Sequence, residues 1–314
     1  MQARGRKGQL LMAFETEFGQ TPATPAAIRL PFETCGIRAS QSLNEDNTIR
    51  NNRNPAQPSR GFVDVSGQTV VPVDAIAFGY WLKALFGAPE TTSDVDIYTH
   101  VFKPAETQPS MVLERGFTDI GKYALSNGCK VSNLSLDIGG EGDQNASIDI
   151  IGASEVLGGS SFAGTPTSLS LVKFNRFQAA VTLDGAVAAK ITAGNVAFDA
   201  ALDGNQYLIG GQGFRGDIPE GLLQPSGSIT ALFEDLTLLD LAVNGTETAI
   251  AFTWTNGANS LEIKFPEVVF ERTSPPIDGP QGIVIEMPFR GYYDDSDEKA
   301  AAQVTLINEH ASYE

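Results

Sequence analysis

One glycine-rich segment has the spacing of a nucleotide-binding loop. Residues 211–216 read GQGFRG and match the pattern GxGxxG. A dinucleotide loop of this kind follows a strand and opens a helix, whose first amides bind the pyrophosphate. Asp217, Ile218 and Pro219 come next, and the proline opposes a helix that begins at the last glycine. The sequence therefore predicts no nucleotide cofactor.

Histidine and cysteine are too sparse for the usual metal sites. His100 and His310 are the two histidines, and neither has a histidine neighbour in the sequence. Zinc sites need several nitrogen or sulfur ligands, so we expect no metal. Cys35 and Cys129 are predicted to be free thiols in a reducing compartment. No nucleophile elbow is present, although sequence order alone does not decide whether a Ser–His–Asp or Cys–His group forms in space. We predict no catalytic residues and no enzyme activity.

Acidic residues gather near the C-terminus, at Asp294, Asp295 and Asp297, with Glu298 beside them. A calcium loop would space its carboxylates and place a glycine among them, and that glycine is missing. We interpret the cluster as a solvated acidic loop.

The whole chain is acidic. It has 314 residues, 21 basic and 38 acidic side chains, and a formal net charge of −17. A protein that grips nucleic acid needs a basic surface, whereas a protein that lies beside DNA without holding it is suited by the opposite sign. The acidity is equally compatible with a simple role in solubility. No apolar run approaches the ~18 residues of a membrane span, and the N-terminus lacks the pattern of a secretory signal.

Residues 61–87 are the most regular stretch and recur later in the chain. They predict a strand, a turn at Gly67, a second strand, and a helix that Asp74 caps and Gly87 ends. Residues 221–245 repeat this order, with Ser226 and Gly227 each 160 residues after their counterparts. Residues 196–205 likewise resemble residues 37–46. We interpret the two stretches as an internal duplication.

Strand patterns dominate the remaining sequence, so the predicted fold is mainly β. We expect two tandem β-sandwich or open-barrel modules, each with one flanking α-helix. The expected divisions are an N-terminal arm at residues 1–27, a first module at 28–157, a linker at 158–170 and a second module at 171–314. Open sheets have edges with unpaired backbone groups, and a duplicated β-module is suited to pairing with copies of itself in a ring.

Many short motifs, in order, resemble the bacteriophage tail tube (major tail protein) family. They include LLMAFETEFGQTPATP, RLPFETCGI, GFVDVSGQTVVPVD and IYTHVFKPAETQPSMVLERGF in the first half, and ITAGNVAFDAALDG, SGSITALFED and NSLEIKFPEVVFE in the second. The resemblance covers nearly the whole chain. It implies a structural virion protein without catalysis, with modules of the tail-tube type.

That resemblance also implies the assembly and the location. Subunits form rings, rings stack into the hollow phage tail, and double-stranded DNA passes through the lumen without specific binding. Two modules in one chain predict a trimeric ring with pseudo-sixfold symmetry. The partners would be copies of the chain and other tail proteins, with no membrane. The protein would be made in the host bacterial cytoplasm and reside in the virion.

Contacts between rings are expected at the arm and at the loops 44–60 and 203–220. The residues predicted to make them are charged: Arg4, Arg6, Lys7, Arg50, Arg53, Arg60, Arg215, Asp294, Asp295 and Asp297. Alternate residues of 129–151 and 174–196 are candidates for the lumen wall.

Two other functions stay open. The same module could form a tail terminator or a baseplate hub, or the chain could be a carbohydrate-binding or hydrolytic virion protein. The latter would expose aromatic rings around a cleft, whereas Trp81 and Trp254 lie in patterns typical of a core.

Overall fold

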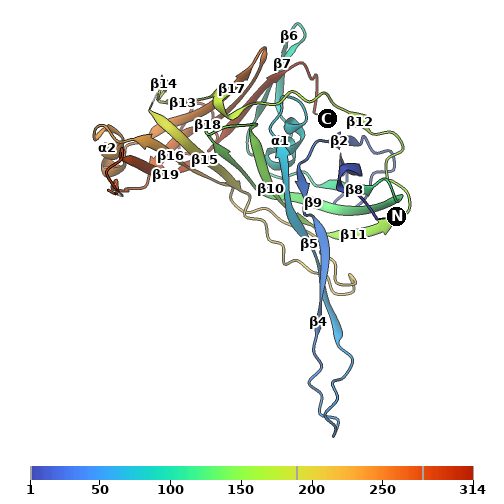
Figure 1. Ribbon diagram of the computed structural model, residues 1–314. Helices are drawn as coiled ribbons and strands as arrows, with labels where there is room; N and C mark the ends of the chain where they lie inside the picture. Colours follow the sequence, from blue (N-terminus) through green and yellow to red (C-terminus); the bar gives the residue numbers. More distant parts are fainter. Residues whose placement is uncertain (1, 189, 278, 314) are drawn as a thin grey trace.

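A computed structural model describes residues 2–188, 190–277 and 279–313 (Figure 1). Its fold is mainly β, as predicted, with two short α-helices. The elements of the first half are η1 (Gly5–Lys7), β1 (Gly8–Phe14), β2 (Ile28–Leu30), β3 (Thr34–Cys35), β4 (Arg38–Asn44), β5 (Ser59–Pro72), α1 (Phe78–Phe86), β6 (Glu90–Asp94), β7 (Ile97–Phe102), β8 (Met111–Phe117), β9 (Lys122–Ile138), β10 (Asn145–Gly152) and β11 (Ser154–Gly158).

A short strand, β12 (Thr167–Ser168), separates the halves. The elements of the second half are η2 (Arg176–Gln178), β13 (Ala179–Leu183), β14 (Ala186–Val187), β15 (Ile191–Asp199), β16 (Gln224–Leu232), α2 (Thr237–Asn244), β17 (Thr248–Asn256), β18 (Asn259–Phe270), β19 (Val284–Tyr292) and β20 (Gln303–Asn308).

Helix α1 ends where the sequence predicts, but it begins at Phe78 with Ala77 as its N-cap, so Asp74 lies one turn before the helix and does not cap it. The Asp74 carboxylate accepts hydrogen bonds from the backbone amides of Ile76 (2.8 Å) and Ala77 (2.7 Å) in the turn that leads into the helix. Gly87 ends it with φ 99°, a conformation that glycine adopts without a steric penalty. Eight of its nine residues are buried, Lys83 being the exception. The helix is therefore held between layers and does not lie on the surface.

Gly67 differs from the prediction. We expected a turn there, but β5 runs unbroken through it for 14 residues. A Cβ atom at Gly67 would lie 2.4 Å from the carbonyl oxygen of Gly36. Glycine is required here because a neighbouring backbone approaches closely. In the sequence, such a glycine looks the same as one that forms a turn.

Strands of the first half form two ladders that share the long strand β9. The N-terminal part of β9 pairs with β8 and β11, and β8 pairs with β1. Its C-terminal part pairs with β10, followed by β5 and β4. All of these pairs are antiparallel. One strand therefore passes from one ladder into the other.

Strands of the second half pair in the same order around β18. The strand order β13–β17–β18–β20 corresponds to β1–β8–β9–β11, and β18–β19–β16–β15 corresponds to β9–β10–β5–β4. Even a register irregularity recurs. It falls after Met111↔Cys129 in the first half and after Thr248↔Val268 in the second. A short 3₁₀ helix also precedes the first strand of each half.

Two ladders join the halves into one body. β9 pairs with β15 from Asn133↔Asp199 to Ile138↔Gly194, and β7 pairs with β20. One continuous hydrophobic core contains buried residues of both halves, among them Trp81 and Trp254. The prediction that both tryptophans belong to the core is confirmed.

The described residues of the expected arm (2–27) and of the expected linker (158–170) are attached to the rest of the fold by strand pairing and apolar contacts. Residues 8–14 form β1, which pairs with β8 along its full length and buries Leu10, Leu11 and Met12. In the segment between the halves, Phe162 and Ala163 pack against Leu11 and Ala13. Apolar side chains in both segments explain this attachment, because their burial is worth about 25 cal/mol per Å².

Candidate assembly surfaces

Strands β5, β10, β9, β15 and β16 form one sheet to which both halves contribute, here called the shared sheet. The side of this sheet that faces away from the core is polar. Strand registers place Gln68, Asp149, Asn133 and Asp199 in one row across four neighbouring strands. Asp149 accepts hydrogen bonds from Gln68 (3.0 Å) and from Asn133 (3.3 Å). The side chains of this face are mostly carboxylates, amides and hydroxyls: Asp64, Gln68, Asn133, Ser135, Asp137, Ser147, Asp149, Asn195, Asp199, Ser226, Ser228 and Thr230.

Some residues of the polar face lie in the segments that the sequence suggested for the lumen wall. Residues 129–151 supply five of its side chains, whereas residues 174–196 supply Asn195. Arg38 and Arg290, opposite Ser66 and Ser226 in their ladders, add positive charge near its margins. Acidic groups outnumber these arginines, so the face is weakly acidic.

Among the open edges of the described residues, two correspond to the edges that β9 and β15 join inside the chain. Strand β4 occupies the place in the first half that β15 occupies in the second, and among the described residues it pairs with β5 alone. Residues 271–277 directly follow β18 and correspond to the C-terminal part of β9. They form no strand, however, and are mostly exposed. Each half therefore lacks a partner at one of these two corresponding edges.

The connection between β4 and β5 projects far from the rest of the molecule (Figure 1). It contains Arg50 and Arg53, and Arg60 lies at the start of β5; all three side chains are exposed. Arg50 forms an ion pair with Asp46 at 3.3 Å. Asp46 has its pKa lowered mainly by hydrogen bonds from Thr48. The hairpin presents a cluster of arginines at a distance from the core.

Arg215 has a different environment from the other predicted contact residues. Its guanidinium forms an ion pair with Asp64 and donates to the carbonyl oxygen of Gly152 at 2.9 Å, and only 7% of the side chain is exposed. The ring of Tyr207 lies 5.2 Å from it. Arg215 therefore binds the loop of the second half to strand β5 of the first, and we remove it from the candidate contacts between rings.

The remaining acidic candidates lie in the loop between β19 and β20. Asp294, Asp295 and Asp297 are exposed. The backbone amides of Asp294 and Asp295 donate to the Glu267 carboxylate at 2.8 and 3.0 Å. The neighbouring charges of Asp294 and Glu267 raise the pKa of Asp295. This arrangement holds several negative charges together at the surface, where a cationic partner would relieve their repulsion.

The two helices are covered to very different extents. The C-terminal segment lies on α1: Tyr313 donates to the carbonyl oxygen of Ile76 at 3.0 Å, and Asn308 donates to that of Ala75. On α2, Ala242 alone is buried among the helical residues. Sequence reasoning missed this contrast, because both helices have a similar apolar pattern.

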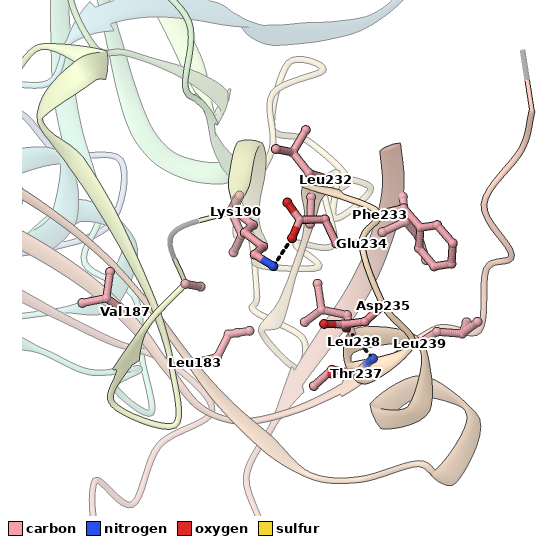
Figure 2. A pocket seen from close by; sticks show the side chains of 14 residues that line it. Leu183, Val187, Lys190, Leu232, Phe233, Glu234, Asp235, Thr237, Leu238 and Leu239 are labelled. Atoms are coloured by element: carbon pink, nitrogen blue, oxygen red, sulfur yellow. Dashed lines mark hydrogen bonds and ion pairs between the residues drawn. The ribbon is translucent and has the colours of Figure 1, made fainter. Parts of the chain in front are cut away.

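A pocket of about 340 Å³ opens beside the start of α2. Figure 2 shows apolar side chains such as Leu183, Val187 and Leu238 around it, with the ion pair of Lys190 and Glu234 at its rim. It is lined by the strand ends of β13 to β16 and by the β16–α2 connection. The equivalent connection in the first half is covered by protein.

In the segment 211–216, the structure has turns and no helix. Both cysteines are free, as predicted, and burial raises the pKa of each thiol. Within residues 2–188, 190–277 and 279–313, no group of three potential metal ligands occurs, and no helix there is long and apolar enough to cross a membrane.

Comparison with protein families gives the decisive observation. The family model for phage tail tube proteins matches residues 5–291. This chain belongs to the phage tail tube protein family. The family is structural, so the tail tube protein is a component of the phage tail, and membership implies assembly with itself and with other tail proteins. A comparison with curated proteins gave no match.

Proposed function

We propose that three copies of this tail tube protein close into a ring with pseudo-sixfold symmetry, and that rings stack into a hollow tube through which DNA leaves the virion. We attribute the repeated pairing order of the two halves to duplication of one module. Three chains with two modules each supply six similar units, and closed rotational symmetry gives every unit the same kind of neighbour.

The pairing of β9 with β15 carries this proposal. That ladder of six residue pairs joins the edge of one half to the edge of the other. The corresponding edges, residues 271–277 and strand β4, remain open in the single chain. We propose that residues 271–277 of one copy pair with β4 of the next copy. Pro275 and Pro276 have no amide hydrogen, so the contact would use the carbonyl oxygens of this segment and the amides of its other residues.

The polar face of the shared sheet is our candidate for the lumen wall. Aspartates such as Asp137 and Asp149 would repel the phosphates of a passing duplex. Screening limits this repulsion to about 8 Å at physiological salt. The neighbouring amides and hydroxyls offer weak, exchangeable contacts. Such a wall suits a conduit that keeps DNA moving and does not bind it specifically.

Stacking of rings is assigned to the projecting hairpin. We propose that Arg50, Arg53 and Arg60 meet Asp294, Asp295 and Asp297 of the adjacent ring. An exposed ion pair contributes only about 0–1 kcal/mol, so the strength of stacking must come from repetition around the ring. Permanent assemblies commonly bury about 2,000 Å² or more per interface, which requires further contacts from the ring surfaces.

Native mass spectrometry and negative-stain electron microscopy of the purified chain test the proposal. We expect trimers and hollow tubes with sixfold features. A ring of six chains would refute the two-module arrangement. Single rings that never polymerise would favour a tail terminator or baseplate hub, and a persistent monomer that binds a glycan array would favour a carbohydrate-binding virion protein.

A further inference from the structure

The segment around Phe174, between the two halves, forms backbone hydrogen bonds with two strand ends of the first half. Phe174 is fully buried and lies between two strand ends of the first half. Its amide donates to the carbonyl oxygen of Val73 at 3.0 Å, and its carbonyl oxygen accepts from the amide of Gln144 at 2.9 Å. Lys173 pairs with Asp74 in an antiparallel bridge. This segment therefore forms isolated β-bridges to two strand ends beside the start of α1.

The second half has the same two strand ends without the insertion. The Phe233 amide donates to the Ile283 carbonyl oxygen at 3.0 Å, as the Val73 amide donates to that of Gln144 at 2.8 Å. Phe233 follows β16 as Val73 follows β5. In the described part of the chain, no backbone group pairs with the carbonyl oxygen of Phe233 or with the amide of Ile283. A place for a short strand is open there, beside the pocket of Figure 2.

The N-terminus is the counterpart of the segment that contains Phe174. Helix η2 directly precedes β13, and η1 directly precedes β1 in the equivalent position. Asn175 and Arg4, the residues before these helices, have similar extended conformations, with φ −110° and ψ 147° against φ −118° and ψ 128°. Counting back from the helices, Ala3 corresponds to Phe174 and Gln2 to Lys173.

We infer that residues 2–4 of one copy dock against the β16–α2 connection of a neighbouring copy in the same ring. Ala3 lies between Phe233 and Ile283 of that neighbour, as Phe174 lies between Val73 and Gln144 within the chain. Gln2 then faces Glu234, the counterpart of Asp74. This inference rests on the proposed ring, and it places Arg4, Arg6 and Lys7 at a contact within the ring instead of a contact between rings.

Charge supports this assignment. Arg4, Arg6 and Lys7 are exposed and close together at the N-terminus. The receiving surface carries Glu234, Asp235 and Asp240 with Lys190 as its one cation among the pocket residues. The two surfaces thus have opposite net charge, which favours their association and orients it. The docked segment would also cover part of the surface around α2, where Leu236, just before the helix, and Val243 are exposed apolar residues.

Disulfide trapping tests the contact. Residues opposite each other in an antiparallel bridge have Cβ atoms about 4.5–5.5 Å apart, so the variant Gln2→Cys/Glu234→Cys should form a disulfide between copies. The background would carry Cys35→Ala, because Cys35 is partly exposed whereas Cys129 is buried. After mild oxidation of assembled protein, non-reducing electrophoresis should show covalent trimers. The matched control Gln2→Cys/Asp294→Cys should remain monomeric on the gel.

The outcomes separate this contact from the proposed function. Tubes that form normally, without a disulfide between positions 2 and 234, overturn the docking while the ring proposal stands. A disulfide in the Asp294 control instead places the N-terminus between rings and also overturns it. If neither variant nor the unchanged chain assembles, both proposals fail. Removal of residues 2–4 should lower the urea midpoint only slightly, because it removes the hydrogen bond from the Arg4 amide to Asp119 (2.9 Å). It should reduce the fraction of assembled protein at least tenfold.

Discussion

The Arg215 guanidinium forms an ion pair with Asp64, a residue 151 positions earlier in the chain. The pair connects the loop before β16 to strand β5, so a loop of one half is held by a strand of the other. Replacement of Arg215 by Met should lower the free energy of unfolding by about 1–3 kcal/mol, because the carbonyl oxygens of Gly152 and Gly204 lose their charged donor. Urea unfolding measures this change. Arg53→Met, in the exposed hairpin, is the control and should have no effect on the single chain.

Gly67 and Gly227 should be equally intolerant of a side chain. A Cβ atom would lie 2.4 Å from the carbonyl oxygen of Gly36 in the first case and 2.3 Å from that of Asn195 in the second. Each Gly→Ala variant should therefore lose about 2–4 kcal/mol of stability, since a strand must move. Gly164→Ala, with open space around it, should be nearly neutral. A neutral result at Gly67 would contradict the close backbone contact.

Asp74 should make stability depend on pH. Burial raises its pKa from 3.8 to about 6, so the folded state holds a proton that the unfolded state has lost between about pH 4 and pH 6. The free energy of unfolding should fall by about 3 kcal/mol as pH rises through this window and stay level above it. In Asp74→Asn, this fall should be missing from urea titrations. A parallel pH profile for both proteins would contradict a protonated Asp74.

Two histidines make the free energy of unfolding depend on pH in the opposite direction. Comparing Asp74→Asn with the unchanged chain removes their contribution. Burial lowers the pKa of His100 and His310. Their stabilising contribution is present above about pH 6.5 and is lost as pH falls. Both proteins share it, so the difference between their profiles isolates Asp74.

The open edge of β4 can be blocked without damage to the fold. The amide of Gly36 donates to Gln68 in β5, and strand residues alternate in direction, so the Ala39 amide points away from β5. Ala39→Pro should therefore change the free energy of unfolding by less than about 0.5 kcal/mol. It should abolish ring formation, because proline has no amide hydrogen to donate to the neighbouring copy. Ser40→Pro, whose amide faces β5, should instead destabilise the chain. Rings formed by Ala39→Pro would count against the edge pairing.

The projecting hairpin should be needed for stacking but not for ring closure. With Arg50, Arg53 and Arg60 all replaced by Gln, we expect folded trimers that give short or no tubes by negative-stain microscopy. High salt should weaken tubes of the unchanged chain in the same direction, since exposed charge pairs are screened. Full-length tubes from the triple variant would assign stacking to another surface.

The N-terminal residues require a finer deletion than the sequence suggested. An arm over residues 1–27 implies that removal of residues 1–20 leaves a folded subunit. That deletion would remove β1, whose Leu10, Leu11 and Met12 are fully buried, and should unfold much of the first half. Apolar residues inside a short polar segment were the signal for this strand.

Local patterns in the sequence were sufficient for the fold class, for the position of α1, for the core location of Trp81 and Trp254, and for the free cysteines. These features depend on spacing within one segment, where side chains alternate or recur at a helical period. Tertiary structure alone decided that Gly67 lies within a strand, that Arg215 faces inward, and that β9 of one half pairs with β15 of the other. A strand pattern shows which face is buried but not which distant edge completes its ladder, because every backbone offers the same amides and carbonyls.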